Sequence, residues 1–305
     1  MAFLYALPGA VAEGLIWGLM AIGVYISFKI LDIADLTVDG SICTGACVFA
    51  ALLAVGLPVW LCMVLALLAG AAAGTVTGLL HAALGIPAIL AGILTQLMLY
   101  SVNLLTLGGK SLMAVDHRAN RLLLHMSDNP HAILAAGLLV VLTILVLWRF
   151  FYTEFGLTLK STGDNPHMSR AQGVNVKFNR VLGLAISNAI VALAGALLAQ
   201  YKGSANINDG RGAIVIGLAA IFIGLSVSLK IKPNFVCSLI GVVGGGIVYY
   251  IVYNFVILLG LKTDYLKMLS ALIVALFLAV PYLKAEYFTK PKVPQHAGKG
   301  GPGHA

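Results

Sequence analysis

Apolar runs separated by short polar intervals fill most of this 305-residue chain. Runs of about 20 apolar residues predict helices that cross a membrane, and these runs lack the period-2 alternation of a membrane-spanning β-strand. The pattern therefore predicts an all-α fold, a polytopic transmembrane helical bundle of about nine membrane-spanning helices (8–10). The predicted helices cover residues 10–28, 41–57, 59–80, 86–107, 132–151, 180–200, 211–229, 235–259 and 265–283.

Polar residues gather in two segments of the chain. The interval 152–179 is the longest polar stretch between predicted helices, and the chain beyond residue 284 is rich in Pro, Gly and Lys. A tail with so little apolar content cannot bury a core. We therefore expect a transmembrane domain over 1–284, with one long polar loop at 152–179, and a disordered cytoplasmic tail over 285–305.

Composition and charge support a membrane protein. The chain is 60% hydrophobic and 10% charged, whereas a soluble domain carries about 25% charged residues. The net charge of +8 comes from basic residues in a few loops and the tail. That distribution is typical of cytoplasmic loops and does not indicate a nucleic-acid-binding surface. Counting back from a cytoplasmic C-terminus places 152–179 and 229–234 inside, and the N-terminus and 108–131 outside.

Signatures of enzymes and of metal sites are missing from the sequence. It contains no Gly-Lys-Ser/Thr phosphate loop, no HExxH and no GxSxG. The four cysteines lie in apolar segments without His or carboxylates at zinc-site spacing, so we interpret them as small buried residues. They are Cys43, Cys47, Cys62 and Cys237. We therefore expect a chain that is not an enzyme and that binds no metal.

Three carboxylates, Asp32, Asp35 and Asp39, lie in the segment KILDIADLTVDGS between two apolar runs. One interpretation is a helix start, with Asp35 at the N-cap and Asp39 in or beside the first turn. The other is an ion-coupling site, since charged residues at membrane depth mark ion or proton pathways. The segment is either a loop or a break inside the membrane.

Uncharged amides interrupt several of the apolar runs. Gln96, Asn103 and Asn188 either form hydrogen bonds between helices or line a polar path, and hydrogen bonding between helices is the more common role. The candidate path is completed by residues of the aspartate segment: Asp35, Thr37, Asp39 and Ser41. Glycines at four-residue spacing, Gly70, Gly74 and Gly78, predict close helix packing.

The loop 152–179 contains its own helix signal. Asp164 and Asn165 before Pro166 are typical of a helix start, and Gly173 is a usual helix stop. We therefore expect a short amphipathic surface helix in this loop. It either folds back on the loop or docks onto a partner subunit.

Four segments in order resemble one family of membrane proteins. IADLTVDGS resembles that family's IDLSVGS, ALGIPAILAGILTQ its LGIPPFIATL, and TGDNPHMSRAQGVN its TGxNxxAARxxGI loop. GLAISNAIVALAGALLAQYKGSANINDGRG resembles the helix and outer loop that follow. Over most of its length the chain is similar to permeases of ABC importers of the branched-chain amino acid and ribose type, closest to the tryptophan/tyrosine-type branch. Asp39 departs from the family pattern by interrupting its V-G-S.

The resemblance implies a bacterial inner-membrane importer subunit for a small neutral or zwitterionic solute, with an amino acid as the first candidate. It implies two cytoplasmic ATPase subunits that bind ATP and Mg, a periplasmic or lipoprotein binding protein, and a second permease copy, as a homodimer or pseudo-dimer. This chain itself would then hold no cofactor. The residues implied in coupling to the ATPase are Gly163, Asp164, Asn165, Arg170, Ala171 and Gly173.

Charged residues of the outer loops are candidates for docking the binding protein, or are an ordinary solvated surface. They are Asp116, Arg118, Arg121 and Lys202. The alternative function is a stand-alone secondary transporter or channel that uses Asp32, Asp35 and Asp39 for ion coupling.

Overall fold

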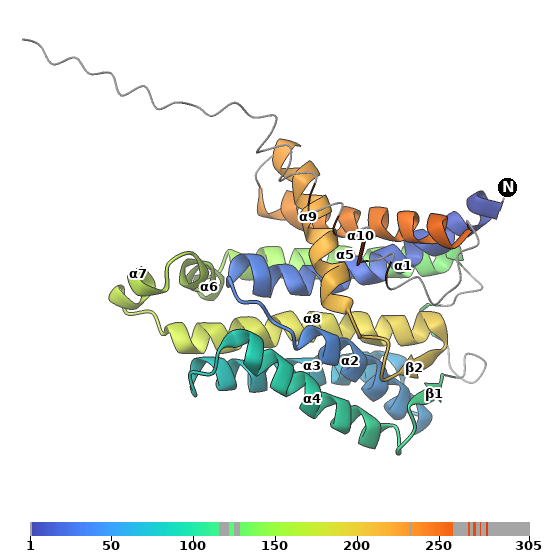
Figure 1. Ribbon diagram of the computed structural model, residues 1–305, viewed down its shortest axis with the longest axis horizontal. Coiled ribbons are helices and arrows are strands. Elements are labelled where there is room, and N and C mark those ends of the chain that lie inside the picture. Colours follow the sequence, from blue (N-terminus) through green and yellow to red (C-terminus); the bar gives the residue numbers. More distant parts are fainter. Residues whose placement is uncertain are drawn as a thin grey trace, which may run out of the picture.

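The computed structural model describes residues 2–115, 122–124, 129–231 and 234–258, with single positions at 268, 271, 272, 275 and 279. Within these residues the fold is an all-α bundle with one two-stranded antiparallel sheet (Figure 1). The helices are α1 (Ala2–Tyr25), the π-helix η1 (Ile26–Ile30), α2 (Val38–Ala54), α3 (Val59–Ala82), α4 (Ala88–Thr106), α5 (Asn129–Phe151), α6 (Glu154–Asp164), α7 (Pro166–Ala171), α8 (Val176–Lys202), α9 (Ala213–Ile231) and α10 (Phe235–Leu258). The strands are β1 (Leu112–Ala114) and β2 (Ser204–Asn206), which pair with Met113 opposite Ala205.

Six described helices are long and apolar enough to cross a membrane. They are Ala6–Ile30, Val59–Ala82, Ala88–Thr106, Asn129–Phe151, Val176–Lys202 and Phe235–Ile257. Two of the predicted spans form shorter apolar helices, Val38–Ala54 and Ala213–Ser226. Most of the ninth, 265–283, and the whole tail 285–305 lie outside the described residues. The total of about nine spans therefore stays a prediction.

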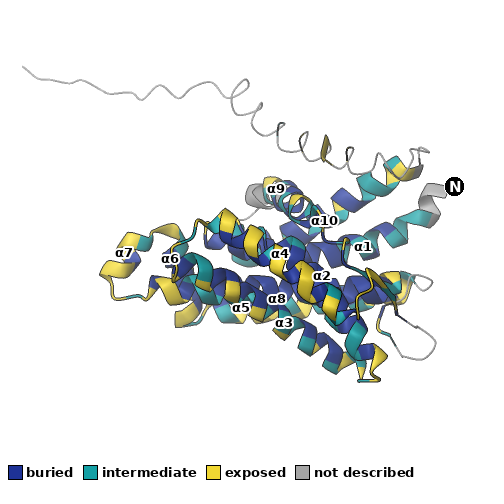
Figure 2. Cartoon of the chain, turned by 60° about the horizontal axis from the view of Figure 1, so that its bottom comes forward, coloured by how far each residue is buried: buried dark blue, intermediate teal, exposed yellow. Residues whose placement is uncertain are grey.

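Helices α1 and α8 lie at the centre of the bundle. In their apolar windows 83% and 72% of the residues are buried, against 28% in both α4 and α5. Figure 2 shows the consequence, a buried interior with exposed residues along the outer helices. The exposed side chains of α4 and α5 are largely Leu, Ile and Val, the composition of a lipid-facing surface.

The predicted glycine stripe forms the contact between α3 and α8. A Cβ at Gly70 would collide with the carbonyl oxygen of Asn188, and one at Gly74 with that of Leu184. Gly78 meets the backbone of Val181 in the same way. Because small residues let two backbones approach this closely, the stripe fixes α3 along α8 over more than two turns.

The two ends of the bundle differ in character. Helices α6 and α7 lie at one end, and the N-terminus and the β1–β2 pair lie at the other (Figure 1). Asn234, between α9 and α10, lines a cavity together with Lys160 of α6. The polar loop 152–179 and Asn234, the last residue of the predicted loop 229–234, therefore lie at the same end, while the side of the membrane that this end faces stays a prediction.

The aspartate segment is a break inside the bundle. Residues 31–37 are not helical, yet Asp35 and Thr37 are only 2% and 0% exposed. Thr37 contacts Thr77 of α3 through their hydroxyls, 2.7 Å apart. Helix α2 thus begins in the interior, next to the middle of α8, and does not begin at an end of the bundle (Figure 1).

Candidate translocation path and coupling segment

A buried polar network joins the break to α8. The Asn188 side-chain amide donates to Asp35 Oδ2 at 2.6 Å, and Asn188 Oδ1 accepts from the Ser41 hydroxyl at 2.6 Å. Asp35 Oδ1 accepts from the backbone N–H of Thr37 at 2.9 Å. All four residues are at most 2% exposed. Four predicted path residues therefore come together as a closed network in which each polar side chain has a partner.

The structure corrects the predicted helix cap. The N-cap of α2 is Thr37, two residues after Asp35, and its side chain makes no capping bond. Asp35 instead holds the turn that leads into the helix, and its second oxygen binds α8. A local cap signal was misread here because the carboxylate has a partner 153 residues away in the sequence.

Asp39 lies in the first turn of α2, as predicted. Its two oxygens, however, accept from the backbone N–H groups of Gly212 and Ile214, each at 2.9 Å. These groups belong to the start of α9, where unpaired N–H groups and the helix dipole favour a negative charge. Asp39 therefore caps a helix other than its own and holds the starts of α2 and α9 together.

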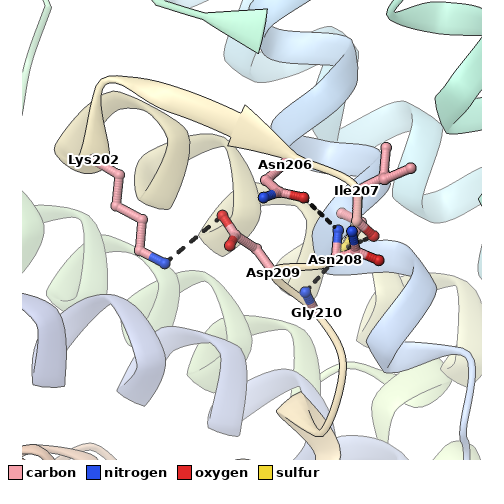
Figure 3. Close-up of polar contacts among 7 residues, drawn as sticks. Lys202, Asn206, Ile207, Asn208, Asp209 and Gly210 are labelled. Atoms are coloured by element: carbon pink, nitrogen blue, oxygen red, sulfur yellow. Dashed lines mark hydrogen bonds and ion pairs between the residues drawn. The ribbon is translucent and has the colours of Figure 1, made fainter. Parts of the chain in front are cut away.

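The loop between β2 and α9 is held against α2 by a second residue. Cys43 donates its thiol to the carbonyl oxygen of Ile207 at 3.3 Å, and its sulfur accepts from the Gly210 N–H at 3.0 Å. Figure 3 shows the same loop in close-up, where Asp209 also lies 3.7 Å from the ammonium of Lys202. Cys43 is thus a buried structural residue that fixes this loop inside the bundle.

A cavity of about 410 Å³ opens between α2, α4 and this loop. Three predicted path residues line it: Asp39, Gln96 and Asn103. Asn103 is 1% exposed, and its Oδ1 has no hydrogen-bond partner in the structure. A buried oxygen left unpaired is costly, so it marks a place where a bound donor would be stabilised.

Sequence reasoning missed two polar residues of this cavity, Tyr100 and Arg211. Tyr100 lies four residues after Gln96 on α4, so the two side chains share a helix face. This spacing could have identified Tyr100 as a second lining residue. Arg211 is the cation of the NDGRG segment directly before an apolar run. This position next to a predicted membrane helix is the sequence signal that could have identified it as a cavity residue. The cavity therefore combines one cation, one anion and two amides among its described lining residues.

The predicted short helix of the polar loop is present as α7. Asn165 is its N-cap, with Oδ1 accepting from the N–H groups of His167 and Met168 at 3.1 and 3.0 Å. Pro166 is the first helical residue, and Gly173 follows the helix with φ +84°. Arg170, Ala171 and Gly173 are exposed at the tip of the bundle. Whether α7 couples to an ATPase stays a prediction.

Helix α6 connects this tip to the bundle. Gly163 lies against the carbonyl oxygen of Ile30, where a Cβ would collide, and Asn179 of α8 donates to the Thr162 hydroxyl at 3.0 Å. Asp164 is exposed at the end of α6. A displacement of α7 would therefore act through α6 on η1 and α8.

The remaining predicted residues do not converge on a site in the described structure. Lys202 is half-exposed and paired with Asp209, while Asp116, Arg118 and Arg121 lie outside the described residues. Asp32 is exposed with φ +56°, apart from the buried network of Asp35. No three His, Cys, Asp or Glu side chains among the described residues are placed to hold a metal ion.

Comparison with known proteins agrees with this architecture. The family model described as "Branched-chain amino acid transport system / permease component" matches residues 9–280. A tyrosine transport system permease protein of Clostridioides difficile (strain R20291) is 36% identical over 269 residues, which cover 88% of this chain and 88% of that protein. An uncharacterized protein of Rickettsia prowazekii (strain Madrid E) is 31% identical over 284 residues, which cover 91% and 97%.

More distant transport proteins also match. The autoinducer 2 import system permease protein LsrC of Escherichia coli (strain K12 / DH10B) is 29% identical over 147 residues, which cover 48% of this chain and 42% of that protein. No solved structure matches the chain. The resemblance drawn from the four sequence segments is confirmed by the family match. The chain belongs to the family of branched-chain amino acid transport system permease components.

Proposed function

We propose that this chain is the transmembrane permease subunit of an ATP-driven importer that moves a small neutral or zwitterionic solute, with an amino acid as the first candidate, into the cytoplasm. The observation that carries the proposal is the cavity of about 410 Å³ where the starts of α2 and α9 meet inside the bundle. Transporters place solute sites where discontinuous helices meet near mid-membrane. The volume also falls in the usual range of small-molecule sites, about 300–1,000 Å³.

The lining of this cavity suits a solute with both charges. Arg211 offers a guanidinium for a carboxylate, whereas Asp39 and the unpaired Asn103 oxygen offer acceptors for an ammonium group. A solute with both charges can contact the guanidinium and these acceptors at the same time. The relative named as a tyrosine transport permease supports an amino acid.

The movement driven by ATP hydrolysis would reach the bundle at the end that carries α6 and α7. Exposed α7 is the docking element for a cytoplasmic ATPase, which binds ATP and Mg, and α6 passes the movement to η1 and α8. The end with α6 and α7 then faces the cytoplasm of a bacterium. The β1–β2 end receives the solute from a periplasmic or lipoprotein binding protein, with Lys202 and the segment 116–121 as the docking region. A second permease copy completes the transmembrane unit.

The alternative of an ion-coupled secondary transporter finds less support. Its three aspartates have separate surroundings, with Asp35 in the closed network, Asp39 on the start of α9 and Asp32 exposed. A shared ion site needs carboxylates that face one another.

Reconstitution of the permease with its ATPase and binding protein tests the function. Uptake of radiolabelled tyrosine and leucine should require ATP and the binding protein and should persist with a protonophore present. An ATPase-site variant in the partner subunit is the matched control and should abolish uptake. Uptake that ignores ATP and collapses with the protonophore would establish the alternative.

A further inference from the structure

A second cavity, of about 430 Å³, lies at the end of the bundle that carries α6 and α7, away from the candidate path. We call it the basal cavity. It is enclosed by the end of α1 with η1, the end of α5, α6, and the start of α10. Two lysines from separate elements line it, Lys29 of η1 and Lys160 of α6. Asp164 is the single carboxylate among its described lining residues.

Aromatic side chains beside the basal cavity indicate its level relative to the membrane. Trp148 and Tyr152 at the end of α5 are 40% and 69% exposed, and their rings pack edge to face with centroids 5.4 Å apart. Exposed Trp and Tyr at the end of a spanning helix are typical of the membrane–water interface. Tyr152 itself lines the basal cavity. The two lysines therefore lie at the level of lipid headgroups.

Apolar side chains continue outward from the mouth of the basal cavity. Leu157 lines it and is 58% exposed, and Phe155 on the same helix is 61% exposed. Helix α6 lies across the end of the long helices (Figure 1). A short amphipathic helix in this position rests in the interface with its exposed apolar residues against acyl chains. Apolar contacts beside a cationic cavity fit a lipid better than a free ion.

We propose that the basal cavity binds the phosphate group of an anionic lipid headgroup, with Lys29 and Lys160 as its cationic contacts and the acyl chains along Tyr152 and Leu157. Basic pockets between membrane helices are a general means of holding such headgroups. The start of α10, at Asn234 and Phe235, also borders the cavity, where its backbone N–H groups favour an anion. This proposal does not depend on the transport function.

A lipid bound in the basal cavity would connect η1 and α6, the elements through which a movement of α7 would pass. A phosphate between Lys29 and Lys160 bridges η1 and α6, which already meet where Gly163 packs on Ile30. Because α6 leads directly into α7, an anionic lipid would stiffen the base of α7. The lipid composition of the membrane would then influence how firmly α7 is held.

Native mass spectrometry of the full chain, extracted from vesicles of phosphatidylcholine with or without phosphatidylglycerol, tests the proposal. The wild-type protein should retain phosphatidylglycerol selectively, and K29Q/K160Q should lower its apparent affinity about 30-fold. Lys177→Gln, an exposed lysine on α8 that does not line the basal cavity, is the matched control and should retain the lipid.

A gain-of-binding variant separates the proposal from simple misfolding. Asp164→Asn removes the one described carboxylate of the lining and should raise the affinity for phosphatidylglycerol several-fold. Equal retention by wild type, K29Q/K160Q and D164N would overturn the proposal. Binding of inorganic phosphate with the same lysine dependence, but without lipid retention, would assign the basal cavity to a free phosphate and overturn the lipid assignment.

Discussion

The carboxylate of Asp39 in α2 accepts a hydrogen bond from the backbone N–H of Ile214 in α9, at 2.9 Å and across 175 residues of sequence. The contact joins two helices that both begin inside the bundle. The start of α9 has backbone N–H groups without a partner in their own helix, and Asp39 accepts hydrogen bonds from two of these groups. A single side chain therefore makes it possible for α9 to begin next to a solute-sized cavity.

Replacing Asp39 should weaken this junction. Asp39→Ala removes the acceptors for two α9 N–H groups, and loss of such a cap costs about 1–2 kcal/mol. For a chain of this size we expect the melting temperature of the purified protein to fall by about 2–6 °C, together with a loss of uptake. Asp32→Asn removes a charge from an exposed residue of the same segment and should change neither quantity. Identical behaviour of the two variants would show that the junction contributes nothing.

The Asp35–Asn188 hydrogen bond can be tested by exchanging the two side chains. Asn188→Asp sets two buried carboxylates against each other, so we expect a destabilisation of about 3–5 kcal/mol. Adding Asp35→Asn restores one donor and one carboxylate, with Ser41 still able to donate, and should recover most of that loss. A double-mutant cycle on thermal stability measures the coupling. Additive effects of the two substitutions would contradict a direct interaction.

The sequence predicted the helices far better than it predicted their partners. Runs of about 20 apolar residues and the stripe Gly70–Gly74–Gly78 are local patterns, and they predicted the helices and a close packing face on α3. The sequence did not identify α8 as the helix that packs on this face. Asp35 and Asp39 were assigned to their own helix because a cap signal is also local. Their partners lie 153 to 175 residues away, a distance over which spacing carries no information.

The candidate site was predicted in part for the same reason. Gln96, Asn103 and Asn188 stood out as amides in apolar runs, but spacing alone could not separate Asn188, which closes a network, from Asn103, which lines a cavity. Arg211 was missed because it stands at the boundary between the predicted outer loop and the predicted helix 211–229, whereas the fold brings the preceding loop back into the bundle beside Cys43.

The α3–α8 glycine contact should be intolerant of even one methyl group. Gly74→Ala drives a Cβ into the carbonyl oxygen of Leu184, so we expect a loss of about 1–3 kcal/mol and reduced yield of folded protein. Gly137→Ala, inside α5, is the matched control because nothing lies within 4 Å of its added Cβ. Since Ala is the better helix former, that variant should be neutral or gain up to about 1 kcal/mol. Thermal unfolding in detergent compares the two.

The stability of helix α7 should depend on its N-cap residue, Asn165. Asn165→Ala removes the acceptor for the His167 and Met168 N–H groups and should cost about 1 kcal/mol locally. We expect lower solute-stimulated ATPase activity in the reconstituted complex, with normal membrane insertion. Asn165→Ser keeps a capping oxygen and should retain most of the activity. Full coupling by the Ala variant would show that α7 is not the element that transmits ATP hydrolysis.

Narrowing the cavity at Asn103 should separate solute passage from stability. Asn103→Leu replaces the amide oxygen, which is buried without a partner, and the amide nitrogen with two bulkier methyl groups, so the protein should be as stable as wild type or more stable. Uptake should nevertheless fall at least about tenfold, because the solute loses a hydrogen-bond acceptor and passes an apolar wall. Thr106→Val, on the same helix and outside the cavity, is the control, since its hydroxyl bonds only the Val102 carbonyl of its own helix. A stable Asn103→Leu protein with unchanged uptake would place the solute path elsewhere in the bundle.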